Sequence, residues 1–187
     1  MKQVIVLSGP VGVGKSAVCA GVIARVGGAG LRVAGAISPP EIVAGAKVGI
    51  WIEDVATGAQ QRLAVAAHLS ARDGKSIQTR RWTFDNAVMA WGAEVIAQAC
   101  PCDLLVIDEL GPLELERGEG WMVAFDVLRA GDYRWALVVV REWLVEKMRA
   151  RVAHMAGVNV RFVTINLANR DAQPARIAGL ITGDIAH

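Results

Sequence analysis

Residues 7–16, LSGPVGVGKS, place a glycine-rich turn directly after a short apolar run. Four residues of this segment fit the pattern G-x-x-x-x-G-K-[ST]: Gly9, Gly14, Lys15 and Ser16. Glycines allow the backbone to wrap tightly and to direct its N–H groups into a concavity of phosphate size. A strand pattern at 4–7 and a helix pattern at 16–26 flank the turn, which is the context expected of a phosphate-binding loop. The segment therefore predicts a chain that binds a polyphosphate.

Each part of this loop has a predicted role. The phosphate-binding residues are Gly9, Pro10, Val11, Gly12, Val13, Gly14, Lys15, Ser16 and Ala17. Lys15 is long enough to reach the β- and γ-phosphates, and we expect it to be catalytic. The hydroxyl of Ser16 can bind Mg²⁺, which is the cofactor we expect. The helix that follows adds the positive end of its dipole to the phosphate site.

Two adjacent acids end a continuous apolar run at residues 103–110, DLLVIDEL. Such a run is typical of a central parallel strand. In open α/β sheets the ligands gather at the carboxyl ends of the strands, where the glycine-rich turn also begins. We expect Asp108 to hold the water shell of the metal ion and Glu109 to be catalytic, either as the base or as the group that positions the attacking water.

Strand and helix patterns alternate at both ends of the chain. Strands are predicted at residues 4–7, 32–38, 103–110, 134–140 and 160–166. Apolar residues recur at helical spacing in three further places, namely Phe84, Val88, Trp91 and Val95; Trp121, Met122, Phe125 and Leu128; and Leu144, Met148, Val152 and Met155. A closing helix is expected near Pro174. This alternation predicts an α/β fold with a mainly parallel sheet flanked by helices.

Residues 45–83 differ from this pattern. Two runs, at 48–54 and 60–67, read as strands joined by a turn, and they predict an inserted β-hairpin. A loop is expected at 73–76 and another strand at 77–83. Because no repeat or domain boundary is evident, we expect residues 1–187 to form a single domain with 45–83 as an embellishment.

Composition excludes several classes of protein. Of the 187 residues, 53% are hydrophobic and 20% charged, which argues against disorder. Charged residues interrupt every long apolar run, so no membrane span is expected, and the apolar start is too short for a signal peptide. We therefore expect a soluble cytoplasmic protein. The net charge of +2 does not indicate a nucleic-acid partner, and the three cysteines and three histidines form no metal-binding spacing.

The phosphate loop together with DELGPLELE, residues 108–116, resembles the small P-loop nucleoside-triphosphatase family of the thermophile type, which includes the cancer-related nucleoside triphosphatase. The segments AGAKVGIWIEDVATG and VTINLANRD also look like stretches of that family. The resemblance implies a Mg²⁺-dependent enzyme that cleaves ATP, GTP and other nucleoside triphosphates slowly, with broad base tolerance. It also implies a RecA-like fold, in which the strand carrying Asp108 does not directly follow the first strand in the sequence.

Carried over by position, the resemblance implies that the loop binds phosphate, that Asp108 serves the metal and that Glu109 serves the water. Asn169 and Arg170 would flank the base or ribose. Glu114 falls on the second acid of the family, to which we assign no role. Lys47 stands where the family more usually has arginine, so the bidentate fork of a guanidinium is missing there.

Three functions remain open at this stage. The leading hypothesis is a nucleoside-triphosphatase. The second is a small-molecule or nucleoside kinase, whose acceptor would sit at the hairpin region with Glu41, Glu53 or Asp54 binding its hydroxyls. The third is a nucleotide-dependent switch or adaptor that acts through a partner protein. Arg80 and Arg81 are either solvated surface residues or an internal arginine finger.

Overall fold

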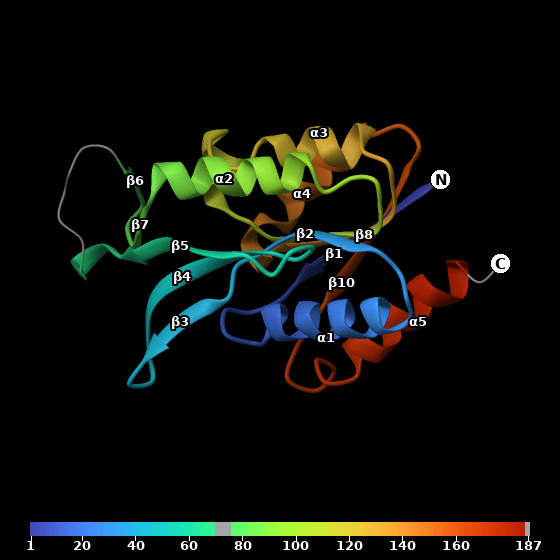
Figure 1. Ribbon diagram of the computed structural model, residues 1–187, viewed down its shortest axis with the longest axis horizontal. Coiled ribbons are helices and arrows are strands. Elements are labelled where there is room, and N and C mark those ends of the chain that lie inside the picture. The colour runs from blue at the N-terminus through green and yellow to red at the C-terminus, as the bar shows by residue number, and fades with distance from the viewer. Residues whose placement is uncertain (70–75, 186–187) are drawn as a thin grey trace.

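In this computed structural model the described residues, 1–69 and 76–185, form a ten-stranded sheet with helices packed on both faces (Figure 1). Most of the strands follow the spatial order β10-β1-β9-β8-β2-β4-β5-β7-β6, and β3 pairs with β4. Their bounds are β1 Lys2–Ser8, β2 Val33–Ile37, β3 Pro40–Val43, β4 Ala46–Asp54, β5 Gln60–Ala66, β6 Ile77–Gln78, β7 Trp82–Phe84, β8 Cys102–Leu110, β9 Tyr133–Val140 and β10 Val158–Thr164. The described residues contain five α-helices, α1 Lys15–Gly28, α2 Asn86–Ala97, α3 Val123–Ala130, α4 Val145–Val152 and α5 Gln173–Ile185, and short helical turns at Ala67–Leu69, Leu113–Arg117 and Glu142–Leu144.

One half of the sheet is parallel. Strands β10, β1, β9, β8 and β2 all run in the same direction, and β9 lies between β1 and β8. The strand that carries Asp108 is therefore separated from the first strand both in sequence and in space, as a RecA-like fold requires. The prediction of an α/β fold with parallel strands flanked by helices is confirmed.

Side chains of the parallel strands alternate between two hydrophobic cores. Val4 and Val6 of β1 face the core beneath α2, α3 and α4, whereas Ile5 and Leu7 face the core beneath α1 and α5. Strand β8 follows the same period of two, because Leu105 and Ile107 face the first core and Leu104 and Val106 the second. Figure 1 shows α1 and α5 side by side below the sheet, opposite α2 and α3. The strand is thus buried on both faces, which explains its continuous apolar sequence.

The inserted region extends the same sheet with antiparallel strands. Strand β4 pairs with β2, β5 pairs with β4, and β7 pairs with β5, so that the hairpin continues outward from the parallel half. The strand expected at 77–83 is divided into β6 and β7, because Thr79 makes a turn with Trp82. Most of the loop expected at 73–76 lies outside the described residues.

Two local differences from the sequence prediction have physical causes. Strand β3 begins at Pro40 and was not predicted, because two prolines stand in this segment. Among the described strands β3 pairs only with β4, and prolines are tolerated in such edge strands. Helix α2 begins after Asp85, whose carboxylate accepts hydrogen bonds from the N–H groups of Ala87 and Val88 at 2.8 and 3.0 Å. Phe84 therefore belongs to β7 and not to the helix face.

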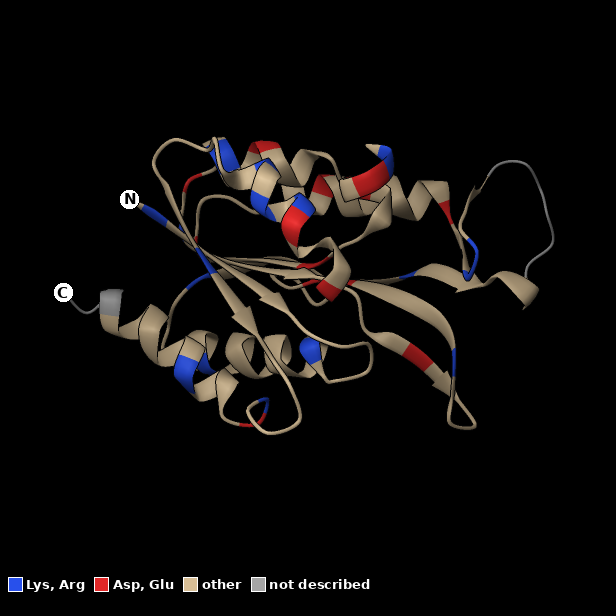
Figure 2. Cartoon of the chain, turned by 180° about the vertical axis from the view of Figure 1, so that it is seen from behind, with Lys and Arg blue, Asp and Glu red and all other residues tan. Residues whose placement is uncertain are grey.

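Charged residues of both signs occur on α3 and α4, whereas α1 on the opposite face of the sheet carries only basic ones (Figure 2). Within the described part of the chain, no helix is long and apolar enough to cross a membrane.

Strands β2 and β8 lie so close together at Gly35 that a substitution there tests how the strands pack. Its φ of +115° is a left-handed conformation, and a Cβ there would collide with the carbonyl oxygen of Val106. We expect Gly35→Ala to lower the free energy of unfolding by more than about 2 kcal/mol, measured by urea denaturation. The matched control, Gly27→Ala in α1, has open space around its Cβ and should stabilise the protein by about 0.5 to 1 kcal/mol. Equal effects of the two substitutions would contradict the strand packing.

Candidate active site

The glycine-rich loop leaves the carboxyl end of β1 and enters α1. Gly9 has a φ of +149° and lies so close to Ile165 that a Cβ would strike its carbonyl oxygen. Gly14 has a φ of +104° and occupies the position before the first residue of α1. Both positions therefore require glycine, one for space and one for conformation. They bend the backbone so that the loop and the first turn of α1 can surround a phosphate.

Lys15 lies over this loop. Its ammonium donates hydrogen bonds to the carbonyl oxygens of Gly9 and Pro10 at 2.8 and 3.0 Å. Partial burial lowers the pKa of Lys15, and the nearby carboxylates of Glu109 and Asp108 oppose this effect. Among the other predicted loop residues, Val13 is buried, while Val11, Gly12 and Ala17 are exposed.

Asp108 ends the buried run of β8 at the same level at which β1 ends. In the register of the sheet, Val6 pairs with Val138 of β9, and Val138 pairs with Ile107, the residue before Asp108. The Asp108 side chain is only 2% exposed, and its Oδ2 atom has no hydrogen-bond partner. Burial raises the pKa of Asp108 to about 7, and hydrogen bonding from Ser16 partly opposes this rise. The structure thus brings the two predicted metal residues together.

Glu109 and Arg141 form an ion pair at the same end of the sheet. The Nε and Nη2 atoms of Arg141 lie 2.7 and 2.6 Å from Oε1 of Glu109, and about a quarter of each side chain is exposed. Arg141 directly follows β9, which lies between β1 and β8. The sequence reasoning missed this residue, although its position after a parallel strand is the same signal that identified Asp108.

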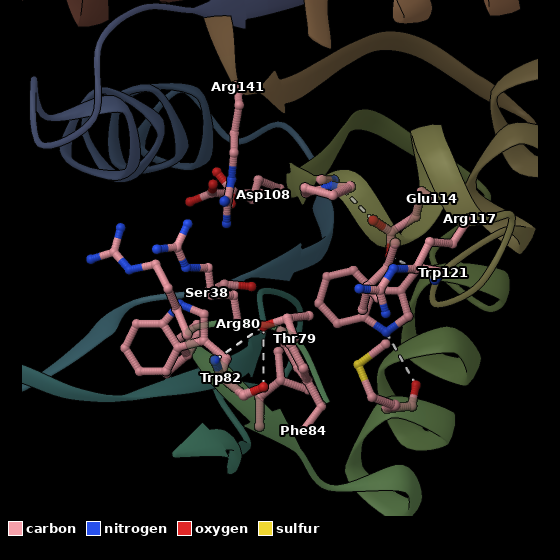
Figure 3. A pocket seen from close by; sticks show the side chains of 18 of the residues that line it. Ser38, Thr79, Arg80, Trp82, Phe84, Asp108, Glu114, Arg117, Trp121 and Arg141 are labelled. Carbon is pink, nitrogen blue, oxygen red and sulfur yellow. Dashed lines mark hydrogen bonds and ion pairs between the residues drawn. The ribbon is translucent and has the colours of Figure 1, made fainter. Parts of the chain in front are cut away.

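These groups line a cavity of about 360 Å³ that reaches from the phosphate loop to the inserted strands (Figure 3). Its lining includes Ser16, Ser38, Lys47, Ile50, Leu63, Thr79, Arg80, Arg81, Trp82, Phe84, Met89, Asp108, Glu109, Glu114, Arg117, Trp121 and Arg141. In Figure 3, Asp108 and Arg141 lie at one end, and Trp82, Phe84 and Trp121 lie around the other. The cavity therefore joins the strand-end acids to an aromatic wall.

Lys47 reaches this cavity from β4. Its ammonium lies 5.2 Å from the centre of the Trp82 ring. Partial burial lowers the pKa of Lys47, while Glu109 acts in the opposite direction. Arg81 is also close enough to lower the pKa of Lys47. Lys47 thus brings a positive charge toward the strand-end acids.

Glu114 stabilises the loop that follows β8. Its buried carboxylate accepts hydrogen bonds from the backbone N–H groups of Gly111 and Trp121, both at 2.9 Å. Burial raises the pKa of Glu114, and these two hydrogen bonds oppose the rise. A Cβ at Gly120 would collide with the Glu114 carboxylate, so this turn requires glycine. The second acid of the motif therefore holds the wall of the cavity in place.

Asn169 and Arg170 lie in the loop after β10, beside the phosphate loop. The Nη1 atom of Arg170 donates to the carbonyl oxygen of Val13 at 3.4 Å, and the side chain passes Gly14. The amide of Asn169 makes hydrogen bonds with the backbone of Asn166 and Thr164. The structure thus brings Arg170 to the glycine-rich loop, while the Asn169 side chain stabilises its own loop.

The acids that the kinase hypothesis assigned to an acceptor are not in the cavity. Glu41 pairs with Arg62 at 2.8 Å, Glu53 accepts from Gln60 at 2.6 Å, and Asp54 caps the turn that follows it. Arg80 and Arg81 do line the cavity, although their side chains are also exposed to solvent.

Comparison with known proteins identifies the family. The family model described as NTPase matches residues 4–178. The chain belongs to this NTPase family. The nucleoside-triphosphatase THEP1 of Caldivirga maquilingensis is 31% identical over 116 residues, which cover 62% of this chain and 63% of that relative, less than two thirds of its length. THEP1 of Methanosarcina barkeri is 29% identical over 178 residues, which cover 93% of this chain and 94% of the relative.

Structural comparison supports the fold. The solution structure of a human cancer-related nucleoside triphosphatase matches with a TM-score of 0.71 and covers 98% of both chains at 17% identity. At this identity the likeness shows the fold, and it agrees with the RecA-like strand order described above. The family resemblance predicted from the sequence is confirmed by these matches.

The raised pKa of Asp108 makes the stability of the metal-free protein depend on pH. Between about pH 4 and 7 the folded state keeps a proton that the unfolded state has lost, so stability falls as pH rises through this window. Asp108→Asn removes this loss, which amounts to at most about 4 kcal/mol above pH 7. Urea unfolding with chelator should show that the substitution stabilises the protein more at pH 8 than at pH 5.

The exposed Asp126, which pairs with Arg129 on α3, provides the control for this measurement. Asp126→Asn should leave the slope of stability against pH unchanged. If the free energy of unfolding changed with pH equally in Asp108→Asn and in the unaltered protein, the burial of the Asp108 carboxylate would be contradicted.

Proposed function

We propose that this chain hydrolyses the terminal phosphoanhydride of nucleoside triphosphates, with Mg²⁺ as cofactor and broad tolerance of the base. The observation that carries the proposal is the buried Asp108 carboxylate beside Ser16, at the strand end from which the phosphate loop emerges. A buried carboxylate oxygen without a partner is costly unless a cation or a donor reaches it in the working state. Nucleoside triphosphates are cytoplasmic metabolites, and we propose that the protein acts in the cytoplasm.

The residues present fit a magnesium ion. The Ser16 hydroxyl and the Asp108 carboxylate provide oxygen ligands, the type that Mg²⁺ prefers. Among the described residues no group of three or more His, Cys, Asp and Glu could enclose a metal by itself, and Mg²⁺ sites in nucleotide enzymes commonly rely on phosphates and water for the remaining ligands. When bound, the ion would neutralise charge on the β- and γ-phosphate oxygens.

The remaining residues can carry out an in-line hydrolysis. Glu109 would accept a proton from a water as the water oxygen attacks the γ-phosphorus and the bond to the β–γ bridging oxygen breaks. Arg141 holds the Glu109 carboxylate through its ion pair, which fixes the direction of the acceptor oxygen. Lys15 and the loop amides would stabilise the charge that develops on the phosphoryl oxygens.

The nucleoside end of the substrate would extend toward the loop after β10. Arg170 approaches the glycine-rich loop there, where its guanidinium donates to the carbonyl oxygen of Val13 and pairs with Asp171. The side chain is partly exposed, and we propose that it contacts the ribose or base from this position. The Asn169 side chain already bonds to its own loop. The Asn166, Asn169 and Arg170 side chains of this loop already make hydrogen bonds within the protein, which leaves few polar groups to read base edges and supports the proposed broad base tolerance.

Replacing Glu109 tests its assignment as the base. Glu109→Gln keeps the size of the side chain but removes the proton acceptor, so we expect turnover to fall about 10²- to 10⁴-fold while nucleotide binding is retained. Phosphate release gives the rate, and calorimetry gives the affinity. Glu146→Gln, an exposed substitution on α4, is the matched control and should leave both values unchanged. Normal turnover in the Glu109 variant would remove it from the mechanism.

Magnesium dependence tests the metal residues. Chelation of divalent ions should abolish phosphate release, and adding Mg²⁺ should restore it. Asp108→Asn should raise the Mg²⁺ concentration for half-maximal turnover about 10- to 100-fold, because the carboxylate would orient metal-bound water. Asp126→Asn is the control for loss of one carboxylate. The assignment fails if activity persists in chelator or if both variants need the same Mg²⁺ concentration.

A further inference from the structure

The cavity beside the strand-end acids is larger than hydrolysis requires. Its volume is about 360 Å³. A single attacking water occupies roughly 30 Å³ of liquid volume, whereas small-molecule sites span roughly 300 to 1,000 Å³. A second organic molecule can therefore fit next to the position of the γ-phosphate.

One wall of this cavity suits a flat ring. Three aromatic side chains, Trp82, Phe84 and Trp121, line the end away from the phosphate loop (Figure 3). The indole N–H of Trp121 donates to the carbonyl oxygen of Met89 at 3.1 Å, which fixes this ring. A ring held in this way, beside Phe84 and Trp82, favours contact with a planar aromatic ligand.

The cavity also carries more positive than negative charge available to a ligand. Three acids line it. The Glu109 carboxylate is paired with Arg141, that of Glu114 is bound by two backbone N–H groups, and that of Asp108 lies at the proposed magnesium position beside Ser16. Lys47, Arg80 and Arg81 line the same cavity, and none of the three forms an ion pair with another residue of the described part of the chain. Cationic side chains without an acidic partner, next to a wall of aromatic side chains, suit a ligand that joins a flat ring to an anionic group.

We propose that this cavity binds a nucleoside monophosphate as a phosphoryl acceptor, so that the protein transfers the γ-phosphoryl group to it as well as to water. The inference rests on the proposed function, because the donor is the nucleoside triphosphate bound at the loop. The base lies against the aromatic wall. The acceptor phosphate lies near Lys47, Arg80 and Arg81, facing the strand-end acids.

The transfer balances without any further reactant. An ionised oxygen of the acceptor phosphate attacks the γ-phosphorus, and the bond to the β–γ bridging oxygen breaks. The donor leaves as a nucleoside diphosphate, and the acceptor becomes one as well. In the absence of an acceptor, water occupies the same place and hydrolysis results. The cations of the cavity offset the repulsion between the two phosphate groups.

The direct test uses the full chain with Mg²⁺, ATP labelled at the γ-phosphate, and CMP, UMP, GMP or AMP in turn. We expect the label to appear in the diphosphate of at least one acceptor, while inorganic phosphate release declines. Phosphate release that continues with no labelled diphosphate from any acceptor would overturn this inference and leave the proposed hydrolysis standing. Absence of both products and of nucleotide binding would instead refute the proposed function, and this inference with it.

A binding experiment distinguishes the acceptor site from the donor site. Calorimetry with CMP is performed on protein saturated with Mg²⁺ and a non-hydrolysable ATP analogue. We expect CMP to bind to this complex with one site per chain. If CMP binds only when the analogue is absent, the two compete for the loop, and the separate acceptor site is ruled out.

A variant that lacks one cationic side chain of the cavity tests where the acceptor phosphate binds. Arg80 is exposed, so Arg80→Ala should fold, and we expect it to raise the KM for the nucleoside monophosphate at least 10-fold. Arg129→Ala on α3 removes an equally exposed guanidinium far along the chain and should leave this KM unchanged. An unchanged acceptor KM in Arg80→Ala would contradict the placement of the acceptor phosphate.

Discussion

The burial of the Asp108 carboxylate is the constraint on which the rest of the site depends. A charged carboxylate inside a protein costs several kcal/mol unless partners compensate it, and one oxygen of Asp108 has no partner within the described residues. The parallel sheet makes this burial tolerable, because neighbouring strands end at the same level and bring Ser16 and Lys15 close. Folding thus prepares a position of negative potential that a phosphate-bound cation can complete.

The alternation of side chains along β8 gives Asp108 and Glu109 different surroundings. Residues before Asp108 alternate between the two cores, so consecutive positions at the strand end begin from opposite faces of the sheet. Asp108 lies near Ser16 of α1, whereas Glu109 pairs with Arg141 beside the cavity. Two adjacent acids can therefore have different environments, one suited to a metal shell and one to a proton acceptor.

The antiparallel extension forms the far side of the cavity, where we propose that the acceptor binds. Strands β4, β5 and β7 continue the sheet beyond β2, and they bring Lys47, Trp82 and the neighbouring arginines to the cavity. The Glu114 carboxylate closes the opposite wall through backbone hydrogen bonds. A region that looked like an embellishment in the sequence thus shapes the space next to the γ-phosphate. Whether this space is used by water or by an acceptor determines the reaction.

The sequence by itself determined the phosphate loop, the strand-end acids and the alternation of strands and helices, because each depends on residues close together in the chain. It also carried the family resemblance that the comparisons confirm. Only the tertiary structure decided the Glu109–Arg141 pair, the role of Glu114 and the cavity. These features join segments far apart in sequence, and strand order and register, which no local pattern encodes, fix which side chains meet.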